Sequence, residues 1–481
     1  MTLAPDVLMM DSGQYQVRAL RFPRLDLGEQ PADLVRVHPT YLAFAKLVSF
    51  VPLERPAWRI NFASALLGAV AVANAALLAA GLTRRRAAVV LTVLVLLFGH
   101  TFWAYSVIAE VMTFQAAVLT AELLCWARYV DRRRAGWLML LALLNGLGVA
   151  GHLQLGLNTF VHVAALLWLA ARREIGLRTL PAWAGLWILG TLPYSAMVAW
   201  YGLQSGDWPA VLHSAVRGRY GPVGQGVDLP TVARGAAGVL LNYPTLLIVL
   251  AVPGAAALLR DAALRRVGGI IVVVAAIQFV FALTYHVPDQ YSFFVPFYAV
   301  AAVLIGVGAS GLLQRRAWRM ALFGLAILPA AVYAAAPPIL RARDVGIFAR
   351  AVPYRDPYDF FIRPWKTGDY NQRRYVAEAF AALPDDAVLL CSETMVWMLR
   401  YGQQIDGLRP DVLVVDDPDA LAENVAPAED GSAAWSRPVF ATDADAPDFP
   451  ATIRERCAVE RRGLLWSVGP PRGGFATGPG T

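Results

Sequence analysis

The sequence predicts an α-helical protein that crosses a membrane many times and carries a small α/β domain at its C-terminal end. Hydrophobic residues make up 57% of the 481 residues and charged residues only 16%, whereas an average soluble domain has roughly 25% charged residues. Apolar segments follow one another up to about residue 340, and each is close to the roughly 20 residues that a bilayer core requires. Each of several arginine clusters closes one of these apolar segments and opens the next. Together these features indicate a polytopic membrane protein.

The arginine clusters also predict the topology, because short loops rich in Lys and Arg stay on the cytoplasmic side of a membrane. The clusters are Arg84–Arg86, Arg132–Arg134, Arg172–Arg173, Arg260–Arg266 and Arg315–Arg316. If all of them are cytoplasmic, the alternate loops lie outside, and no cluster contradicts this alternation. The same placement accounts for the net charge of +7 without nucleic-acid binding, which we do not expect.

Between these clusters we predict about ten spans. They lie near residues 60–82, 87–106, 112–130, 135–151, 153–171, 181–201, 236–259, 267–285, 291–313 and 318–338. The helical membrane domain is therefore expected to cover residues 58–340. Residues 1–57 would then form an outer N-terminal segment.

The N-terminal segment is unusual because a chain that starts outside has no preceding helix to insert it. Met1–Met10 is apolar but too short to span a bilayer, and it lacks the basic region and cleavage site of a signal peptide. We therefore expect Thr2–Met10 to be the stub of an eleventh, first span, truncated by a misplaced start codon. Translocation of a short N-terminus is the alternative. The amphipathic stretch Leu42–Val51 is predicted to be an interfacial helix.

The composition changes at about Arg341, where Pro, Asp and Arg become frequent. Strand-like runs at residues 387–390 and 412–415 and helical stretches at 375–383 and 395–401 predict parallel strands in an extracytoplasmic α/β domain, residues 341–468. The Gly/Pro-rich residues 469–481 are expected to be disordered. Cys391 and Cys457 are compatible with either a disulfide or two free thiols, and no cysteine spacing indicates a metal site.

Several polar residues fall at the outer ends of the predicted spans. Asp11, in Asp11-Ser12-Gly13, could accept a proton from an acceptor hydroxyl, although an Asx turn accounts for the same residues. His38 precedes the interfacial helix and could bind a phosphate or relay a proton; a polar residue at a helix start is the alternative. A carboxylate such as Glu110 near the bilayer is costly and is usually functional or paired, unless it is a solvated loop charge.

Two further outer turns carry polar residues. His152 lies with Asn145, Gln154 and Asn158 where two spans meet. These polar side chains could line a cavity, or they could form hydrogen bonds between helices. The Tyr285–Tyr291 turn carries His286 and Asp289, and a merely solvated turn is the alternative. The polar groups gather at one membrane face, whereas a transporter is expected to carry them near the bilayer midplane. This pattern favours an enzyme that acts on a lipid-linked substrate.

The N-terminal part of the sequence resembles the opening of a bacterial membrane-protein family whose eukaryotic relative is a transmembrane protein O-mannosyltransferase. The residues that carry the resemblance are Thr2–Pro5, Asp11–Gly13, His38–Pro39, Trp58–Asn61, Thr101–Trp103, Ala109–Val111, Gly146–His152, Pro288–Tyr291 and Leu408–Val412. It extends over about four-fifths of the chain. The departures are Gln14, Thr40 and the arginines at positions 18, 21, 24 and 36.

The resemblance implies a GT-C-like membrane glycosyltransferase of the bacterial inner membrane. Such an enzyme moves a sugar, for example mannose, from a polyprenyl-phosphate donor to a protein or glycan hydroxyl on the extracytoplasmic face. Asp11 would be the catalytic base, and Arg59 would hold the donor phosphate by bidentate contacts. The implied substrate-binding residues are His38, Tyr41, Arg59, Asn61, Glu110, His152, His286, Asp289 and Tyr291.

No cofactor besides the donor is expected, a metal requirement stays open, and the oligomeric state is not predicted. The alternative function is a non-enzymatic transporter or assembly scaffold for cell-envelope glycans.

Overall fold

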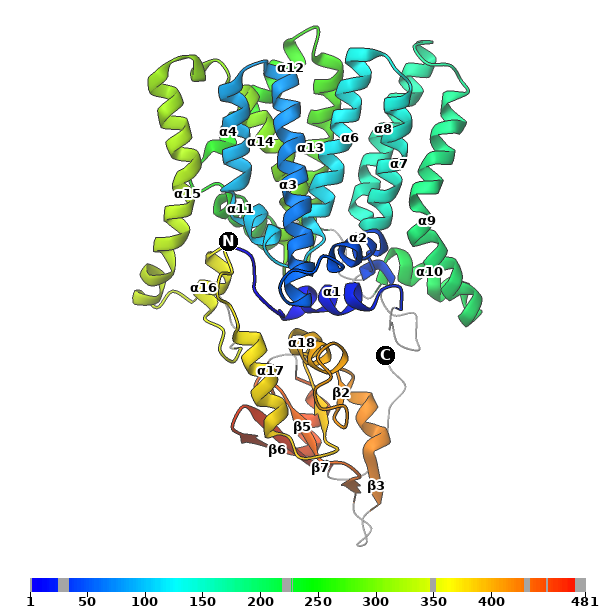
Figure 1. Ribbon diagram of the computed structural model, residues 1–481, viewed down its shortest axis with the longest axis vertical. Coiled ribbons are helices and arrows are strands. Elements are labelled where there is room, and N and C mark those ends of the chain that lie inside the picture. The colour runs from blue at the N-terminus through cyan, green and yellow to red at the C-terminus, as the bar shows by residue number, and fades with distance from the viewer. Residues whose placement is uncertain are drawn as a thin grey trace.

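The computed structural model describes residues 2–24, 34–218, 226, 228–346, 352–427, 433–446 and 449–471. A bundle of long helices lies above a smaller domain of strands and helices, and the N-terminal helices lie between the two (Figure 1). This arrangement places the N-terminal segment where it contacts both parts.

Six helices in the described part of the chain are long and apolar enough to cross a membrane. They are α3 (Pro56–Thr83), η2 with α8 (Leu153–Ala171), α9 (Thr179–Ser205), α13 (Arg265–Thr284), η5 with α14 (Gln290–Ala309) and α15 (Arg316–Ala342). Two bent pairs raise the number to at most eight. They are α4 with α5 (Arg86–Leu97 and His100–Ser106) and α11 with η4–α12 (Leu229–Asn242 and Leu247–Arg260). The protein is thus a multi-pass membrane protein.

The ten predicted segments are all largely helical, but the count of ten spans is not reproduced. Of the remaining helices, α6 (Met112–Arg132) carries charged residues and α7 (Gly136–Gly151) has only 16 residues. Both nevertheless stand beside α3 and α8 in the bundle (Figure 1). Helix α10 (Trp208–Val216) lies in the long loop predicted between residues 202 and 235.

The two bends contact each other. Helix α4 ends before Gly99, where an added Cβ would come within 2.9 Å of the Asn242 side chain. Asn242 in turn accepts a hydrogen bond of 2.9 Å from the Thr101 backbone N–H, which replaces a helical bond lost at the break. Pro244 lies two residues after Asn242, the last residue of α11, and cannot continue that helix. Hydropathy alone does not reveal such breaks, so the sequence predicts one straight span for each bent pair.

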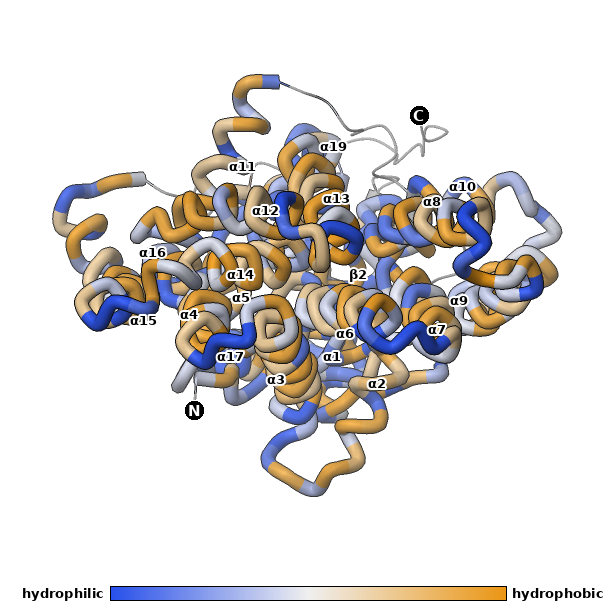
Figure 2. Tube along the Cα trace, turned by 90° about the horizontal axis from the view of Figure 1, so that it is seen from above, coloured by the Kyte–Doolittle hydropathy of each residue, from blue (hydrophilic) through white to orange (hydrophobic). Residues whose placement is uncertain are grey.

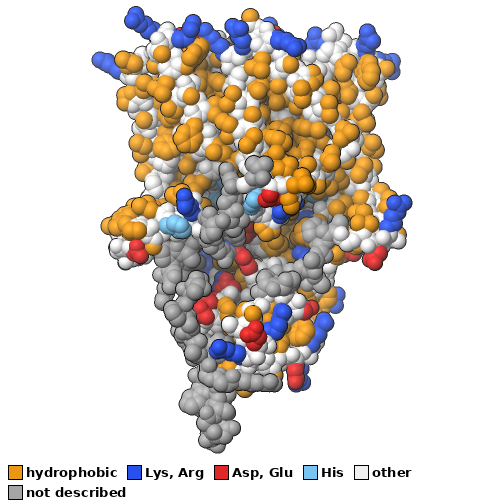
Figure 3. All heavy atoms as spheres, turned by 180° about the vertical axis from the view of Figure 1, so that it is seen from behind, with side chains coloured by type: hydrophobic (Ala, Val, Ile, Leu, Met, Phe, Trp, Pro, Cys, Tyr) orange, Lys and Arg blue, Asp and Glu red, His pale blue; other side chains and the backbone are white. Residues whose placement is uncertain are grey.

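The arginine clusters lie at the end of the bundle remote from the small domain. Seen from above, the loops joining α3 to α4, α6 to α7 and α12 to α13 are strongly hydrophilic (Figure 2). Lys and Arg side chains line this edge of the bundle (Figure 3). Their common position agrees with the predicted alternation of loops; which side of the membrane this face meets stays a prediction.

The N-terminal segment is not helical before Met10, and the expectation that Thr2–Met10 is the stub of a span stays a prediction. Residues 2–9 form an extended, mostly buried strap. Its backbone groups bond to other segments and not within a helix of their own: Ala4 N donates to Val107 O at 2.9 Å, and Asn61 Nδ2 donates to Ala4 O at 3.0 Å. Helix α1 (Met10–Arg21), η1 (Leu34–Arg36) and α2 (Pro39–Ser49) follow. The apolar side chains of Leu47 and Phe50 on and after α2 are exposed, as an interfacial helix requires.

The C-terminal domain contains the predicted α/β unit. Its elements are α16 (Pro357–Ile362), α17 (Asn371–Ala382), β1 (Val388–Leu390), α18 (Glu393–Gln404), β2 (Leu413–Val415), η7 (Pro418–Asn424), β3 (Val425–Pro427), β4 (Ala433–Trp435), β5 (Val439–Ala441), α19 (Ala451–Arg456), β6 (Cys457–Arg462) and β7 (Leu465–Pro471). The main sheet has the order β2-β1-β5-β7-β6, and β1 runs parallel to both β2 and β5. The predicted parallel pair is therefore confirmed.

Two details of the C-terminal prediction change. Strand β7 runs to Pro471, so the expected tail does not begin at Gly469, and residues 472–481 lie outside the described residues. Cys391 and Cys457 are free and buried, as is Cys125. Cys391 and Cys457 are therefore two free thiols and do not form a disulfide with each other.

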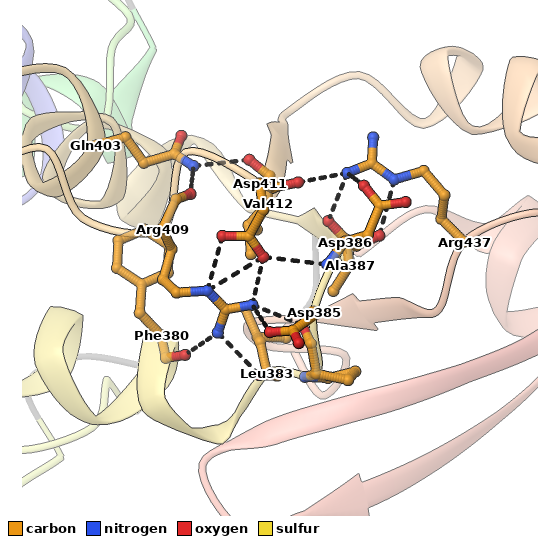
Figure 4. Close-up of polar contacts among 11 residues, drawn as sticks. Phe380, Leu383, Asp385, Asp386, Ala387, Gln403, Arg409, Asp411, Val412 and Arg437 are labelled. Atoms are coloured by element: carbon orange, nitrogen blue, oxygen red, sulfur yellow. Dashed lines mark hydrogen bonds and ion pairs between the residues drawn. The ribbon is translucent and has the colours of Figure 1, made fainter.

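The Leu408–Val412 run, which contributed to the family resemblance, has a structural role in this domain (Figure 4). Arg409 donates hydrogen bonds to the Phe380 and Leu383 carbonyl oxygens at 2.7 and 2.9 Å, at the C-terminal end of α17. It also pairs with Asp411 at 2.7 Å, and Asp411 accepts a bond of 3.0 Å from the Asp386 backbone N–H. These contacts join the end of α17 to the segments around β1 and β2.

A buried carboxylate fastens the C-terminal domain to the bundle. Asp6, in the N-terminal strap, is fully buried and pairs with Arg55 at 2.8 Å, just before α3, and with Arg373 of α17 at 2.7 Å. Helix α1 also packs against α18, and Arg21 donates to Gln404 at 2.6 Å. The domain is thus held against α1, the helix whose first turn carries Asp11.

Candidate active site

A cavity of about 700 Å³ lies between the helical bundle and the C-terminal domain. Its walls come from the start of α1, from η1, from the loops before α6, η2 and η5, and from α16 and α18. Six of the sequence-predicted residues line it: Asp11, His38, Glu110, His152, Asp289 and Tyr291. They belong to segments far apart in the chain, so their convergence is a property of the fold.

Asp11 is placed by the turn that opens α1. Gly13 packs so closely against the Leu8 carbonyl oxygen that a side chain there would collide with it. Asp11 Oδ1 accepts a hydrogen bond of 2.7 Å from Arg36 Nη2, and 42% of the Asp11 side chain is exposed. The second carboxylate oxygen has no partner among the described residues and is available to a ligand in the cavity.

Arg36 connects Asp11 to the C-terminal domain. Its Nη1 donates to Glu393 Oε1 at 2.6 Å, in the first turn of α18, and its side chain is only 17% exposed. The sequence showed Arg36 only as one of the arginines that depart from the family pattern. Because Arg36 and Glu393 are 357 positions apart, no local pattern could pair them.

Glu110 is buried, not a solvated loop charge, with 8% of its surface exposed. Ser64 Oγ donates to the Glu110 carbonyl oxygen and accepts from its N–H, both at 3.0 Å. Tyr41 OH lies 3.0 Å from the same Ser64 oxygen. Burial, followed by the charges of Asp11 and Asp289, raises the pKa of Glu110 well above its usual value. Tyr41 is therefore a positioning residue behind the wall and does not line the cavity.

Asp289 is the third carboxyl group of the cavity. It accepts a hydrogen bond of 3.2 Å from Ser292 Oγ. Burial, with a further contribution from the charge of Asp11, raises its pKa to about 6. Glu110 and Asp289 thus bind protons more readily than ordinary carboxylates, which reduces the negative charge of the cavity.

His38 and His152 stack on each other in the cavity wall, with ring centroids 4.8 Å apart and planes 14° apart. Burial lowers the pKa of His38 well below its usual value and that of His152 to about 4. Both rings are therefore neutral at pH 7. Since His152 Nδ1 accepts from the Gln154 backbone N–H at 3.2 Å, its proton is on Nε2. The pair can offer hydrogen bonds without adding positive charge.

Four predicted substrate-binding residues do not line the cavity: Tyr41, Arg59, Asn61 and His286. The Arg59 guanidinium instead donates to the carbonyl oxygens of Ser49, Leu53 and Glu54, at 2.6–3.1 Å, and thereby holds the turn between α2 and α3. Asn61 is fully buried and binds the N-terminal strap. The geometry gives both residues structural roles, in place of the phosphate contact expected of Arg59 and the substrate contact expected of Asn61.

His286 lies in the same loop as Asp289 but has a different partner. Its Nε2 is 2.8 Å from Asp228 Oδ2, at the start of α11. Three residues of separation in a short turn suffice to send the two side chains to different neighbours. The described residues contain no group of three His, Cys, Asp or Glu side chains close enough to hold a metal ion, and metal dependence stays open.

Comparison with known proteins gives a partial match. Residues 37–175 match the family model described as "Protein O-mannosyl-transferase TMEM260 N-terminal domain". This segment contains His38, Glu110 and His152, and the match confirms the resemblance to that family found in the sequence. The chain has no match among curated protein sequences.

Among solved structures, the chain is similar to the Archaeoglobus fulgidus oligosaccharyltransferase, crystallised with Zn and sulfate. The identity is 13% and the TM-score 0.42, and the alignment covers 86% of this chain and 59% of the other. The chain therefore spans less than two thirds of the length of that protein.

Proposed function

We propose that this protein is an integral membrane glycosyltransferase of the GT-C type. It moves a sugar such as mannose from a polyprenyl-phosphate donor to a hydroxyl group of a protein or glycan. The observation that supports this most is the half-exposed Asp11 carboxylate, paired with Arg36, in a cavity of about 700 Å³ between bundle and soluble domain. The match of residues 37–175 to an O-mannosyltransferase family model supports the same reaction class.

In the proposed reaction, Asp11 acts as the general base. Its second carboxylate oxygen accepts the proton of the acceptor hydroxyl as that hydroxyl oxygen forms a bond to C1 of the sugar. The bond between C1 and the phosphate oxygen breaks, and its electron pair leaves with the polyprenyl phosphate. The products are the glycosylated acceptor and the free lipid phosphate, and the proton stays on Asp11 until water removes it.

Arg36 is the group best placed to meet the leaving phosphate. Its guanidinium already contacts Asp11 and Glu393 at 2.7 and 2.6 Å, and guanidinium groups match phosphate oxygens in charge and geometry. The raised pKa values of Glu110 and Asp289 limit the repulsion that a phosphate would meet in a cavity lined by carboxyl groups. The neutral imidazoles of His38 and His152 can bind sugar hydroxyls beside them.

Aromatic side chains provide a wall for the apolar part of the donor. Phe281, Tyr285 and Phe293 line the cavity and pack on one another, with the Tyr285 and Phe293 rings 4.7 Å apart. Such a wall suits an isoprenoid chain or the face of a sugar ring. The arginine-rich loops lie at the opposite end of the bundle, so the proposal places the reaction on the extracytoplasmic side of a bacterial inner membrane.

The proposal is tested with purified protein, radiolabelled polyprenyl-phosphate mannose and membrane extract as acceptor source. We expect Asp11→Asn to lower label transfer by at least about a hundredfold with an unchanged unfolding temperature. Asp131→Asn is the matched control, because it removes an exposed carboxylate next to Arg132 on the remote face. Wild-type transfer by Asp11→Asn, or no transfer by the wild type with this or any related donor, would contradict the proposal.

One observation favours the second candidate, a transporter of lipid-linked glycans. The bent pairs α4–α5 and α11–α12 meet at Gly99 and Asn242, and interrupted helices are common at transporter sites. A transporter would move labelled lipid-linked glycan across proteoliposome membranes, and this flux would survive Asp11→Asn. Transfer of the sugar that depends on Asp11 would exclude it as the primary activity.

A further inference from the structure

A second cavity, of about 350 Å³, opens at the arginine-rich end of the bundle between α6, α8 and α13. Its lining includes Trp126, Trp168 and Leu169, together with Arg133, Arg265 and Arg266. None of them contributes to the candidate active site, which lies at the other end of the bundle.

The lining divides into an apolar slot and a cationic rim. Ala165, Leu169 and Ile270 form part of the slot, and a Cβ added at Gly269 would meet no atom within 4 Å. The slot therefore has room beside Gly269. Arg133 and the pair Arg265–Arg266 stand at the helix ends that border it.

The rim arginines are held in place by specific contacts. Glu174 Oε2 accepts hydrogen bonds from Arg133 and Arg266 at 2.7 and 2.6 Å. The guanidinium groups of Arg172 and Arg266 both lie over the Trp168 ring, each 5.3 Å from its centroid. The rim combines these arginines and Arg265 with the single carboxylate of Glu174, so its net charge is positive.

The floor of the slot is fixed as well. Trp126 Nε1 donates to His162 Nδ1 at 3.1 Å inside the bundle, which leaves its ring to face the slot. An ordered apolar slot with a cationic rim at the level where helices end is complementary to a lipid with an anionic headgroup. A neutral lipid would lack the favourable charge interaction with the rim, and a soluble anion would have no acyl chain to bury in the slot.

We propose that this cavity binds an anionic phospholipid of the leaflet at the arginine-rich face. One acyl chain lies in the slot beside Gly269, and the phosphate meets the guanidinium groups of Arg265 and Arg266, which offer paired N–H donors. The site is independent of the proposed glycosyl transfer.

The test is native mass spectrometry of the delipidated protein, titrated with phosphatidylglycerol or with phosphatidylcholine of the same chains. We expect phosphatidylglycerol to bind at least about tenfold more tightly. The double variant Arg265→Gln/Arg266→Gln should lose roughly fivefold in affinity for each arginine removed. Gly269→Leu fills the slot, improves helix propensity and should weaken binding of both lipids.

The matched control is Arg315→Gln/Arg316→Gln, which removes the same charge from the same face before α15 and should leave binding unchanged. Equal binding of the two lipids overturns the proposal. So does an equal loss in the two double variants, which would indicate a general charge effect of the face. Displacement of phosphatidylglycerol by millimolar inorganic phosphate would show a phosphate site without a lipid slot and would also overturn it.

Discussion

Asp11 and Glu122 are both acidic residues with hydrogen-bond partners, but Asp11 lines the cavity and Glu122 lies inside the helical bundle. Glu122 in α6 is fully buried and accepts hydrogen bonds from Asn145 at 2.9 Å, Asn158 at 3.0 Å and His162 at 3.1 Å. Asp11 is half exposed and is bound by one partner, Arg36. A carboxylate whose oxygens are fully bound by its neighbours holds helices together, whereas a partly bound carboxylate in a cavity can bind and deprotonate a substrate.

The hydrogen bonds around Glu122 form a chain that reaches the wall of the candidate active site. His162 Nδ1 accepts a hydrogen bond from the Trp126 indole N–H, so the His162 proton is on Nε2. This Nε2–H donates a hydrogen bond to Glu122. On the other side, Gln278 donates to Asn158 at 3.0 Å and accepts from Gln154 at 2.8 Å. Gln154 lines the cavity of the candidate active site. For Asn145 and Asn158 the structure thus favours helix-to-helix hydrogen bonds, and only the end of the chain faces the cavity.

The largest effect is expected from Glu122→Leu. The change leaves the donors of Asn145, Asn158 and His162 buried without an acceptor, which should lower the free energy of unfolding by about 4 kcal/mol. The measurement is denaturant titration in detergent micelles. Glu122→Gln keeps one acceptor and should cost less. A loss below about 1 kcal/mol for Glu122→Leu would remove the distinction between the two carboxylates.

Next in size is Arg36→Gln, which removes the partner of Asp11 and the group proposed to meet the donor phosphate. Label transfer should fall about a hundredfold, as for loss of one preorganised charged donor. Glu393→Gln is the control, because it leaves the contact between Arg36 and Asp11 in place and should reduce transfer less than tenfold. Equal effects of the two variants would show that the ion pair only docks the C-terminal domain.

The third prediction concerns Asp289 and the pH dependence of stability. Since burial raises its folded pKa from an ordinary 3.8 to about 6, the protonated form stabilises the folded state below about pH 4, and this contribution is lost as the pH rises through 6. Asp289→Asn should therefore be more stable than wild type by about 3 kcal/mol at pH 7, the free-energy equivalent of this pKa shift, and by less than about 1 kcal/mol at pH 4. Unfolding temperatures at both pH values test this, and a difference independent of pH would refute the assigned shift.

The sequence was sufficient for the helical class, the common face of the arginine loops, the parallel strand pair and several cavity residues. Outer loops share one face once the spans alternate, so Asp11, Glu110 and Asp289 could be grouped without a structure. Which side chain of a loop enters the cavity depends on backbone geometry that periodicity does not carry. Asp289 enters and His286 does not, although both lie in one turn.

Other features depend on contacts between distant segments. Arg36 acquires its role only because η1, α1 and α18 meet. Arg59 and Asn61 share the family pattern, yet here they bind backbone carbonyl groups. The breaks at Gly99 and Asn242 become visible only when the two bent pairs touch. In each case the missing information is tertiary.

The most direct test of the account compares Asp11→Asn with Glu122→Gln in a single preparation, with transfer rate per folded molecule and unfolding temperature both measured. The account predicts that Asp11→Asn loses at least about a hundredfold in rate at an unchanged unfolding temperature. Glu122→Gln should have a lower unfolding temperature and a rate close to wild type. The reverse pattern, with transfer surviving Asp11→Asn and abolished by Glu122→Gln in folded protein, would contradict the account and move the chemistry to the interior network.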